Sequence, residues 1–115
     1  MLVSEHTFSG GEAFAYDLQA MGRGTVVGEV TRGGAHPGQY ISLDDQLEVF
    51  IPHVRAINPV TQSNWEGHGV IPDLQCSEKD ALLQAQVQFL DTRIDGEEVD
   101  WIRLKLKEYR ETLDS

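Results

Sequence analysis

The first 28 residues constrain the fold most, because they predict a strand, a helix and a second strand in close succession. A short apolar run over residues 1–3 leads into the segment Thr7-Phe8-Ser9-Gly10-Gly11-Glu12, and a helical pattern follows from about Gly10 to Met21. Glycines end that pattern, and the β-branched residues of 25–28 are typical of a buried strand. A helix between two strands predicts a crossover unit, the usual connection between parallel strands.

Ser9 lies where the first strand turns into the helix. The N-terminal end of a helix presents unpaired N–H groups and the positive end of the dipole, both of which favour a developing oxyanion. A hydroxyl aimed at that point is suited to act as a nucleophile. Glu12 stands three residues later, however, so the pair also fits a capping box that stabilises the helix by about 1 kcal/mol without chemistry. Both interpretations remain open on local sequence.

Beyond residue 28 the sequence predicts a loop over 32–38, a hairpin with strands over 40–43 and 47–51, and a long ordered loop over 52–73. Within that long loop, short extended pieces are expected at 55–57 and 69–71. Long loops in compact domains are often functional. In the first helix, one apolar face is expected from the i, i+4, i+7 spacing of Phe14, Leu18 and Met21.

The last third of the chain predicts two helices. Ser77 with Asp80, and Asp95 with Glu98, resemble capping boxes at their starts. Apolar residues of the last helix alternate by three and four positions, at Val99, Ile102, Leu106, Tyr109 and Leu113. This spacing is typical of a helix–helix seam, either within the same chain or between subunits. We therefore expect residues 1–75 to form one unit and residues 76–115 a helical extension that packs on it or on a partner.

Composition excludes several classes of function. The formal charge of −10 would repel nucleic acid and anionic membrane surfaces. Cys76 is the single cysteine, so no internal disulfide can form, and we expect it to be packed rather than reactive. No two histidines have ligand spacing, and neither a metal nor a cofactor is expected. The first residues lack the pattern of a signal peptide, which leaves the compartment undetermined.

Three ordered motifs resemble a known peptidase family: Thr7 to Glu12; Val26-Val27-Gly28-Glu29 with Gly33-Gly34-Ala35-His36-Pro37; and Asn58-Pro59 with the run Asn64 to Asp73. Together they are similar to the C-terminal part of tail-specific (C-terminal processing) serine peptidases. The branch resembled most contains the interphotoreceptor retinoid-binding protein and its bacterial relatives, with tricorn core protease more distant. The resemblance implies a ClpP/crotonase-like α/β core fragment of strand, elbow helix, strands and hairpin, followed by two C-terminal helices. Residues 1–75 would then be the C-terminal part of the catalytic subdomain.

By position, the resemblance implies that Ser9 is the nucleophile and that the amide of Gly10 is one oxyanion-hole donor. Many members use a lysine as general base where this chain has Gly34, and no lysine occurs before Lys79. A Ser–Lys mechanism is therefore excluded within residues 1–78, because a nucleophile needs a base within hydrogen-bond reach. The tricorn-like arrangement instead pairs the serine with a histidine that a glutamate orients. Glu66 matches that glutamate, and the histidine is expected upstream.

Purely structural interpretations of these residues remain open beside the catalytic ones. Glu66 could simply accept a backbone hydrogen bond in its loop, and Trp65 is expected to be a packing anchor rather than a substrate platform. His36 is the best local substitute for the missing base, because its loop should lie near the elbow. The other histidines, at positions 6, 53 and 68, stand in no paired motif.

Three hypotheses of function follow. The chain is the catalytic subdomain of a serine endopeptidase that acts on protein or peptide substrates and is completed by the upstream part of the same protein. Alternatively, it is a noncatalytic module that binds an apolar small ligand on the same fold. In the third hypothesis it is an assembly module, as a homo-oligomer or through strand exchange at the exposed edge of its first strand.

Overall fold

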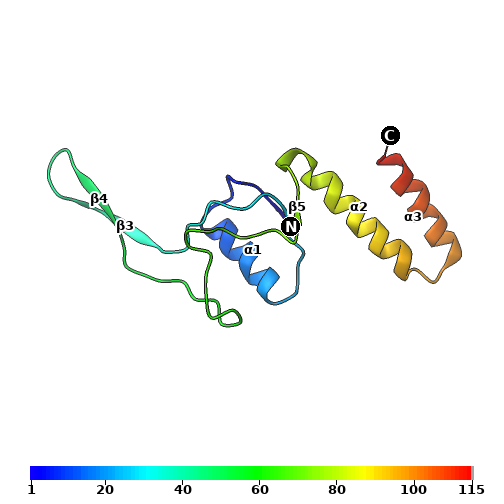
Figure 1. Cartoon of the computed structure of the whole chain (residues 1–115), viewed down its shortest axis with the longest axis horizontal. Helices are drawn as coiled ribbons and strands as arrows, with labels where there is room; N and C mark the ends of the chain where they lie inside the picture. The colour runs from blue at the N-terminus through cyan, green and yellow to red at the C-terminus, as the bar shows by residue number, and fades with distance from the viewer. Residues whose placement is uncertain (115) are drawn as a thin grey trace.

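The structure is a computed structural model that describes residues 1–114 (Figure 1). It contains three helices, a three-stranded parallel sheet and a separate two-stranded hairpin. The elements in chain order are β1 (Leu2–Val3), α1 (Gly10–Ala20), β2 (Val27–Gly28), β3 (Gly38–Ser42), β4 (Glu48–Pro52), β5 (Leu74–Gln75), α2 (Glu78–Gly96) and α3 (Asp100–Thr112). The predicted mixed α/β architecture, with its hairpin and two C-terminal helices, is confirmed.

The parallel sheet has the strand order β1-β2-β5, and α1 connects its first two strands. The crossover unit predicted from the first 28 residues is thus confirmed. Close pairing of β1 with β2 needs a glycine at position 28, where φ is +134° and an added Cβ would lie 1.9 Å from the carbonyl oxygen of Val3. The extended pieces expected at 55–57 and 69–71 are not strands.

The third strand, β5, was not predicted. It has two residues, of which only Leu74 is apolar, so it carries no alternating pattern. Hydrogen bonds to β2 and its flank create it instead: the Leu74 N–H donates to the Val26 carbonyl at 3.1 Å, and the Cys76 N–H donates to the Gly28 carbonyl at 2.9 Å. Tertiary pairing, rather than local propensity, decides such a short strand.

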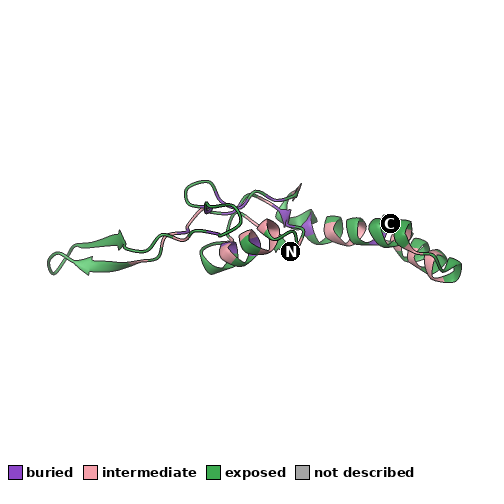
Figure 2. Cartoon of the chain, turned by 90° about the horizontal axis from the view of Figure 1, so that it is seen from below, coloured by how far each residue is buried: buried purple, intermediate pink, exposed green. Residues whose placement is uncertain are grey.

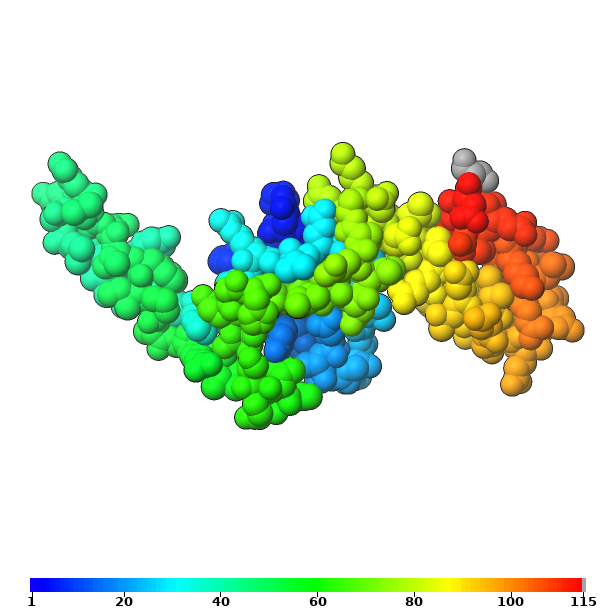
Figure 3. Space-filling view, in the orientation of Figure 1, coloured from blue at the N-terminus to red at the C-terminus, as the bar shows by residue number. Residues whose placement is uncertain are grey.

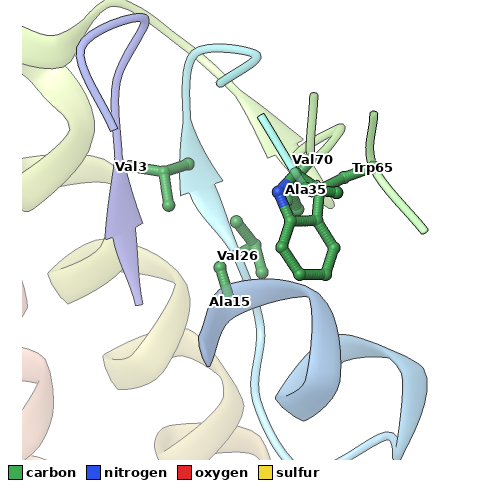
Figure 4. Close-up of a cluster of buried hydrophobic side chains, with 6 residues drawn as sticks. All are labelled: Val3, Ala15, Val26, Ala35, Trp65 and Val70. Carbon is green, nitrogen blue, oxygen red and sulfur yellow. The ribbon is translucent and has the colours of Figure 1, made fainter. Parts of the chain in front are cut away.

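A small apolar core lies between α1, the sheet and the loops (Figure 4). Its buried members are Val3, Ala15, Val26, Ala35, Trp65 and Val70. The helix contributes Ala15, which is 1% exposed, whereas Phe14 is 64% exposed and Met21 is 49% exposed. Two of the three residues of the predicted apolar face, Phe14 and Met21, are therefore exposed, and Leu18 is half-buried; the small Ala15 instead allows the close approach to the core.

The hairpin β3–β4 projects from one end of the chain, and both strands are exposed (Figures 2 and 3). Its register pairs Tyr40 with Phe50, whose ring centroids lie 5.2 Å apart. The carboxylate of Asp44 closes the turn, because its Oδ1 accepts hydrogen bonds from the amides of Gln46 and Leu47. The hairpin and its turn were predicted correctly from the sequence.

The helices α2 and α3 lie at the opposite end (Figure 1), and the chain measures 69 × 32 × 16 Å. α2 packs on β1 and β2, and α3 packs on α2. Ser77 caps α2 as predicted, its side chain accepting from the Asp80 N–H. The capping box expected at Asp95 is wrong, because α2 continues to Gly96 and α3 begins after Val99. None of the helices within residues 1–114 has the length and apolarity needed to cross a bilayer.

Candidate active site

The four residues for which a catalytic role was expected or considered line one pocket of about 650 Å³. They are Ser9, Gly10, His36 and Glu66, which come from the start of α1, the loop after β2 and the long loop before β5. The remaining lining is mostly apolar and comprises Phe8, Ala13, Gly34, Ala35, Pro37, Gly38, Phe50, Pro52, Ala56 and Trp65. Segments far apart in the sequence therefore meet around the predicted nucleophile.

Ser9 is the N-cap of α1 and has φ 52° and ψ −113°. A positive φ is uncommon for a residue with a side chain, and such strain costs about 1–3 kcal/mol where the surroundings hold it. In α/β-hydrolases, a sharp strand-to-helix turn exposes the hydroxyl of the nucleophilic serine. Ser9 and Glu12 adopt the capping-box arrangement that their spacing predicts: the Ser9 side chain stands opposite the backbone N–H of Glu12, although it makes no hydrogen bond of ordinary geometry to it, and the Glu12 carboxylate accepts from the Ser9 amide at 2.8 Å. The Gly10 amide beside it has no hydrogen-bond partner within residues 1–114, as an oxyanion-hole donor requires.

Glu12 is fully buried, with 0% of its surface exposed, and its carboxylate accepts four hydrogen bonds. Oε1 accepts from the Thr31 hydroxyl at 2.5 Å and from the Gly33 amide at 2.6 Å. Oε2 accepts from the Ser9 amide at 2.8 Å and from the Gly34 amide at 2.9 Å. Burial by itself would raise the pKa of Glu12, but these donors favour the charged form more and lower the pKa below its ordinary value.

Thr31 extends this network to the loop before β5. Its buried hydroxyl accepts a hydrogen bond from the Val70 amide at 2.7 Å while it donates to Glu12. Gly69 allows the approach, since φ is +74° there and an added Cβ would lie 2.1 Å from the Thr31 carbonyl oxygen. Sequence reasoning missed Glu12 and Thr31 as site residues. The only signal was the Ser-x-x-Glu spacing, which was interpreted as helix capping.

Glu66 lies at the far side of the pocket and holds the backbone of the loop after β2. Its Oε2 accepts hydrogen bonds from the amides of Ala35 at 2.6 Å and His36 at 3.0 Å. The same oxygen lies 3.8 Å from Nδ1 of the His36 ring. Glu66 therefore has the backbone role that was kept open for it, and it also stands next to an imidazole.

The orientation of the His36 ring follows from Asn64. The Asn64 amide nitrogen donates to the Ala56 carbonyl at 2.7 Å, and its oxygen accepts from the Glu66 amide at 2.9 Å, which fixes the side chain. That nitrogen lies 3.4 Å from His36 Nε2, so Nε2 is the acceptor and a neutral ring carries its proton on Nδ1, toward Glu66. Within residues 1–114, no hydrogen bond joins His36 to Ser9.

Trp65 packs as predicted. It is 5% exposed and belongs to the apolar core, its ring centroid lies 5.3 Å from that of Tyr16, and its indole N–H donates to the Gly34 carbonyl at 3.1 Å. Three histidines, His6, His53 and His68, lie outside the pocket lining and are exposed. Within the described residues, no group of three or more metal-ligating side chains is arranged to hold an ion.

Gly34 occupies the position at which many members of the resembled family have lysine. An added Cβ at Gly34 would lie 2.1 Å from Cε2 of Phe8. The Phe8 ring is in turn covered by the Arg32 guanidinium, whose carbon lies 5.4 Å from the ring centroid. An aromatic ring thus fills the space that a side chain at position 34 would need.

Comparison with known proteins places these observations in a family. Residues 1–76 match the model of peptidase family S41. Among solved structures, the photosystem II D1 C-terminal processing protease matches with a TM-score of 0.56 and 29% identity, over 68% of this chain and 20% of that one. The chain thus spans about a fifth of the length of the matched structure. With its elbow serine, its parallel sheet and its hairpin, the chain belongs to peptidase family S41, the C-terminal processing serine peptidases.

Proposed function

We propose that this chain is the C-terminal catalytic subdomain of a serine endopeptidase, on a ClpP/crotonase-like core, in which Ser9 is the nucleophile. One observation carries the proposal: Ser9 has a strained, positive φ at the N-terminus of α1 and lines a pocket together with Gly10. The Gly10 amide would donate to the oxyanion of a tetrahedral intermediate, and the positive end of the α1 dipole would stabilise the same charge.

The general base in this proposal comes from polypeptide outside the chain. Ser9 needs a base within hydrogen-bond reach, and His36 directs its Nε2 lone pair at Asn64 rather than at Ser9. A histidine from the upstream part of the same protein would enter the open pocket and place its Nδ1–H against Glu66. This is the tricorn-like arrangement, and it fits the absence of lysine before Lys79. The three ordered motifs of the sequence together support a place near the retinoid-binding branch of the family.

Active-site labelling tests this proposal. We expect a fluorophosphonate to label the protein in which upstream polypeptide completes this chain, and Ser9→Ala to abolish the labelling. Ser63→Ala, which changes a serine in an exposed loop, is the matched control and should label normally. The isolated chain should label poorly. Equal labelling of the isolated chain and the complete protein would contradict an external base.

A second function, the binding of an apolar small ligand, is favoured by the pocket lining. Phe8, Phe50 and Trp65 contribute aromatic surface, and no base contacts Ser9 within residues 1–114. Titration of the complete protein with a fluorescent fatty acid tests this function. Saturable binding that Phe50→Ala weakens, while Val49→Ala on the opposite face of the hairpin does not, would support it. Absence of saturable binding would exclude it.

A further inference from the structure

We propose that Glu12 is a positioning residue for the nucleophile: its carboxylate holds the Ser9 backbone in the strained elbow and ties that elbow to the loop at Gly33 and Gly34. The inference rests on the proposed role of Ser9 as nucleophile. It assigns Glu12 no contact with substrate, since its carboxylate is fully buried and saturated by protein donors.

The first step of the argument concerns what stabilises the elbow. With φ 52° and ψ −113°, Ser9 is far from the conformations that residues with a side chain prefer. Its amide does not take part in the helix, and it would be left without a partner if Glu12 did not accept it at 2.8 Å. A hydrogen bond to a charged acceptor is roughly twice as strong as a neutral one. Glu12 therefore supplies a local force that favours the strained conformation.

The second step concerns distance between the two sides of the pocket. A single oxygen, Oε2, accepts from both the Ser9 amide and the Gly34 amide. The two nitrogens therefore cannot move further apart than two hydrogen-bond lengths. Both Ser9 and Gly34 line the pocket, so this oxygen sets how the elbow faces the opposite loop. The other oxygen, Oε1, holds Gly33 and Thr31 and so prevents the carboxylate from rotating.

A glutamine at this position cannot replace the carboxylate. Each carboxylate oxygen of Glu12 accepts two hydrogen bonds, whereas glutamine has one acceptor oxygen and one NH₂ group that only donates. The NH₂ group of glutamine would therefore face one of the two pairs of donors. Either the Ser9–Gly34 pair or the Thr31–Gly33 pair then loses its acceptor. An unpaired buried donor carries the desolvation cost of that group. Glu12→Gln is thus a nearly isosteric test of the charge and of the acceptor count.

Amide hydrogen exchange on this chain measures the effect without any need for catalysis. We expect Glu12→Gln to speed exchange at the amides of Ser9, Gly33 and Gly34 about tenfold to a hundredfold more than at the core amides, because one pair of donors loses its acceptor and the other pair keeps only a neutral, weaker one. Val26→Ala is the matched control, because Val26 is a fully buried core residue whose apolar side chain cannot hydrogen-bond to the carboxylate. It should raise exchange at all protected amides alike.

A second readout separates positioning from simple stability. In the complete protein, Glu12→Gln should reduce the rate of fluorophosphonate labelling at Ser9 by at least tenfold, under conditions where circular dichroism shows that it is folded, whereas Val26→Ala should not. Equal exchange effects of the two variants across the chain would overturn the positioning role. If the wild-type protein fails to label at all, the peptidase proposal fails, whereas the exchange result still decides whether Glu12 holds the elbow.

Discussion

The hydroxyl of Thr31 offers a sharp test of the network beneath the candidate site. Thr31 is 6% exposed; its Oγ1 donates to Glu12 at 2.5 Å and accepts from the Val70 amide at 2.7 Å. Thr31→Val keeps nearly the same volume but removes both hydrogen bonds. Loss of the bond to a carboxylate costs about 1.5–3 kcal/mol, and a buried N–H left without an acceptor costs about 1–3 kcal/mol. Since neighbouring effects are not additive, we expect a loss of about 3 kcal/mol in the free energy of unfolding.

Urea unfolding followed by tryptophan fluorescence measures this loss, because Trp65 is buried in the core next to the site. With a urea slope of about 1.5 kcal/mol/M for a small domain, the midpoint of Thr31→Val should fall by about 2 M. Thr31→Ser is the control: it keeps the hydroxyl, loses one methyl group, and should cost only about 1 kcal/mol. A valine variant as stable as the serine variant would refute the claim that this hydroxyl joins Glu12 to the Val70 segment.

Three further predictions follow from the same structure. The folded-state pKa of Glu12 lies below its ordinary value of 4.5, so its ionisation stabilises the fold above that pH, and this contribution is lost as the pH falls through the lowered pKa. The urea midpoint of the wild type should therefore drop in this pH range, and that of Glu12→Gln should drop less. Parallel acid profiles of the two proteins would contradict the assignment. Gly34→Lys should lower the melting temperature, because its Cβ would lie 2.1 Å from Phe8, and adding Phe8→Ala to this variant should restore part of the loss. A Gly34→Lys protein as stable as the wild type would show that the Phe8 ring moves freely. Leu106→Glu should lower stability and leave the mass by light scattering unchanged, since α3 packs on α2; a lower mass would instead place Leu106 in a subunit contact.

Elements with a strong local signal could be predicted from the sequence. The glycines and the β-branched run that follow α1 predicted the crossover unit, and the polar turn that contains Asp44 predicted the hairpin. The start of α2 was found because Ser77 caps its own helix. In each case the deciding interaction lies within a few residues of the pattern that predicted it, so one sequence was enough.

Features that depend on distant segments could not be predicted in the same way. β5 exists because two residues pair with β2, and Asp95 failed as a helix start because α2 simply continues through it. The packing face of α1 was also hidden, since large apolar residues dominate a pattern, whereas Ala15 makes the close contact. Small residues and two-residue strands leave no periodic signal, although they determine how the layers meet.

The residues of the candidate site show the same division. The resemblance picked out Ser9, Gly10 and Glu66, and the expected position of its loop near the elbow picked out His36. These four do share a pocket, while their catalytic roles stay predictions. Nothing in the sequence placed His36 against Asn64, because that contact depends on the path of the long loop between β4 and β5. The loop is ordered by side chain to backbone hydrogen bonds, which no hydrophobic pattern records.

The two interpretations of Ser9, helix cap and nucleophile, turn out to be compatible. A full capping box would use the Ser9 hydroxyl to bind the helix and the Glu12 carboxylate to bind the Ser9 amide. In this chain the Glu12 bond is made at 2.8 Å, and the Ser9 side chain stands opposite the Glu12 N–H in the capping-box arrangement without a hydrogen bond of ordinary geometry. The carboxylate thus accepts the Ser9 amide from inside the fold, while Ser9 itself lines the pocket. The Ser-x-x-Glu spacing is thus compatible both with helix capping and with the nucleophile role proposed for Ser9.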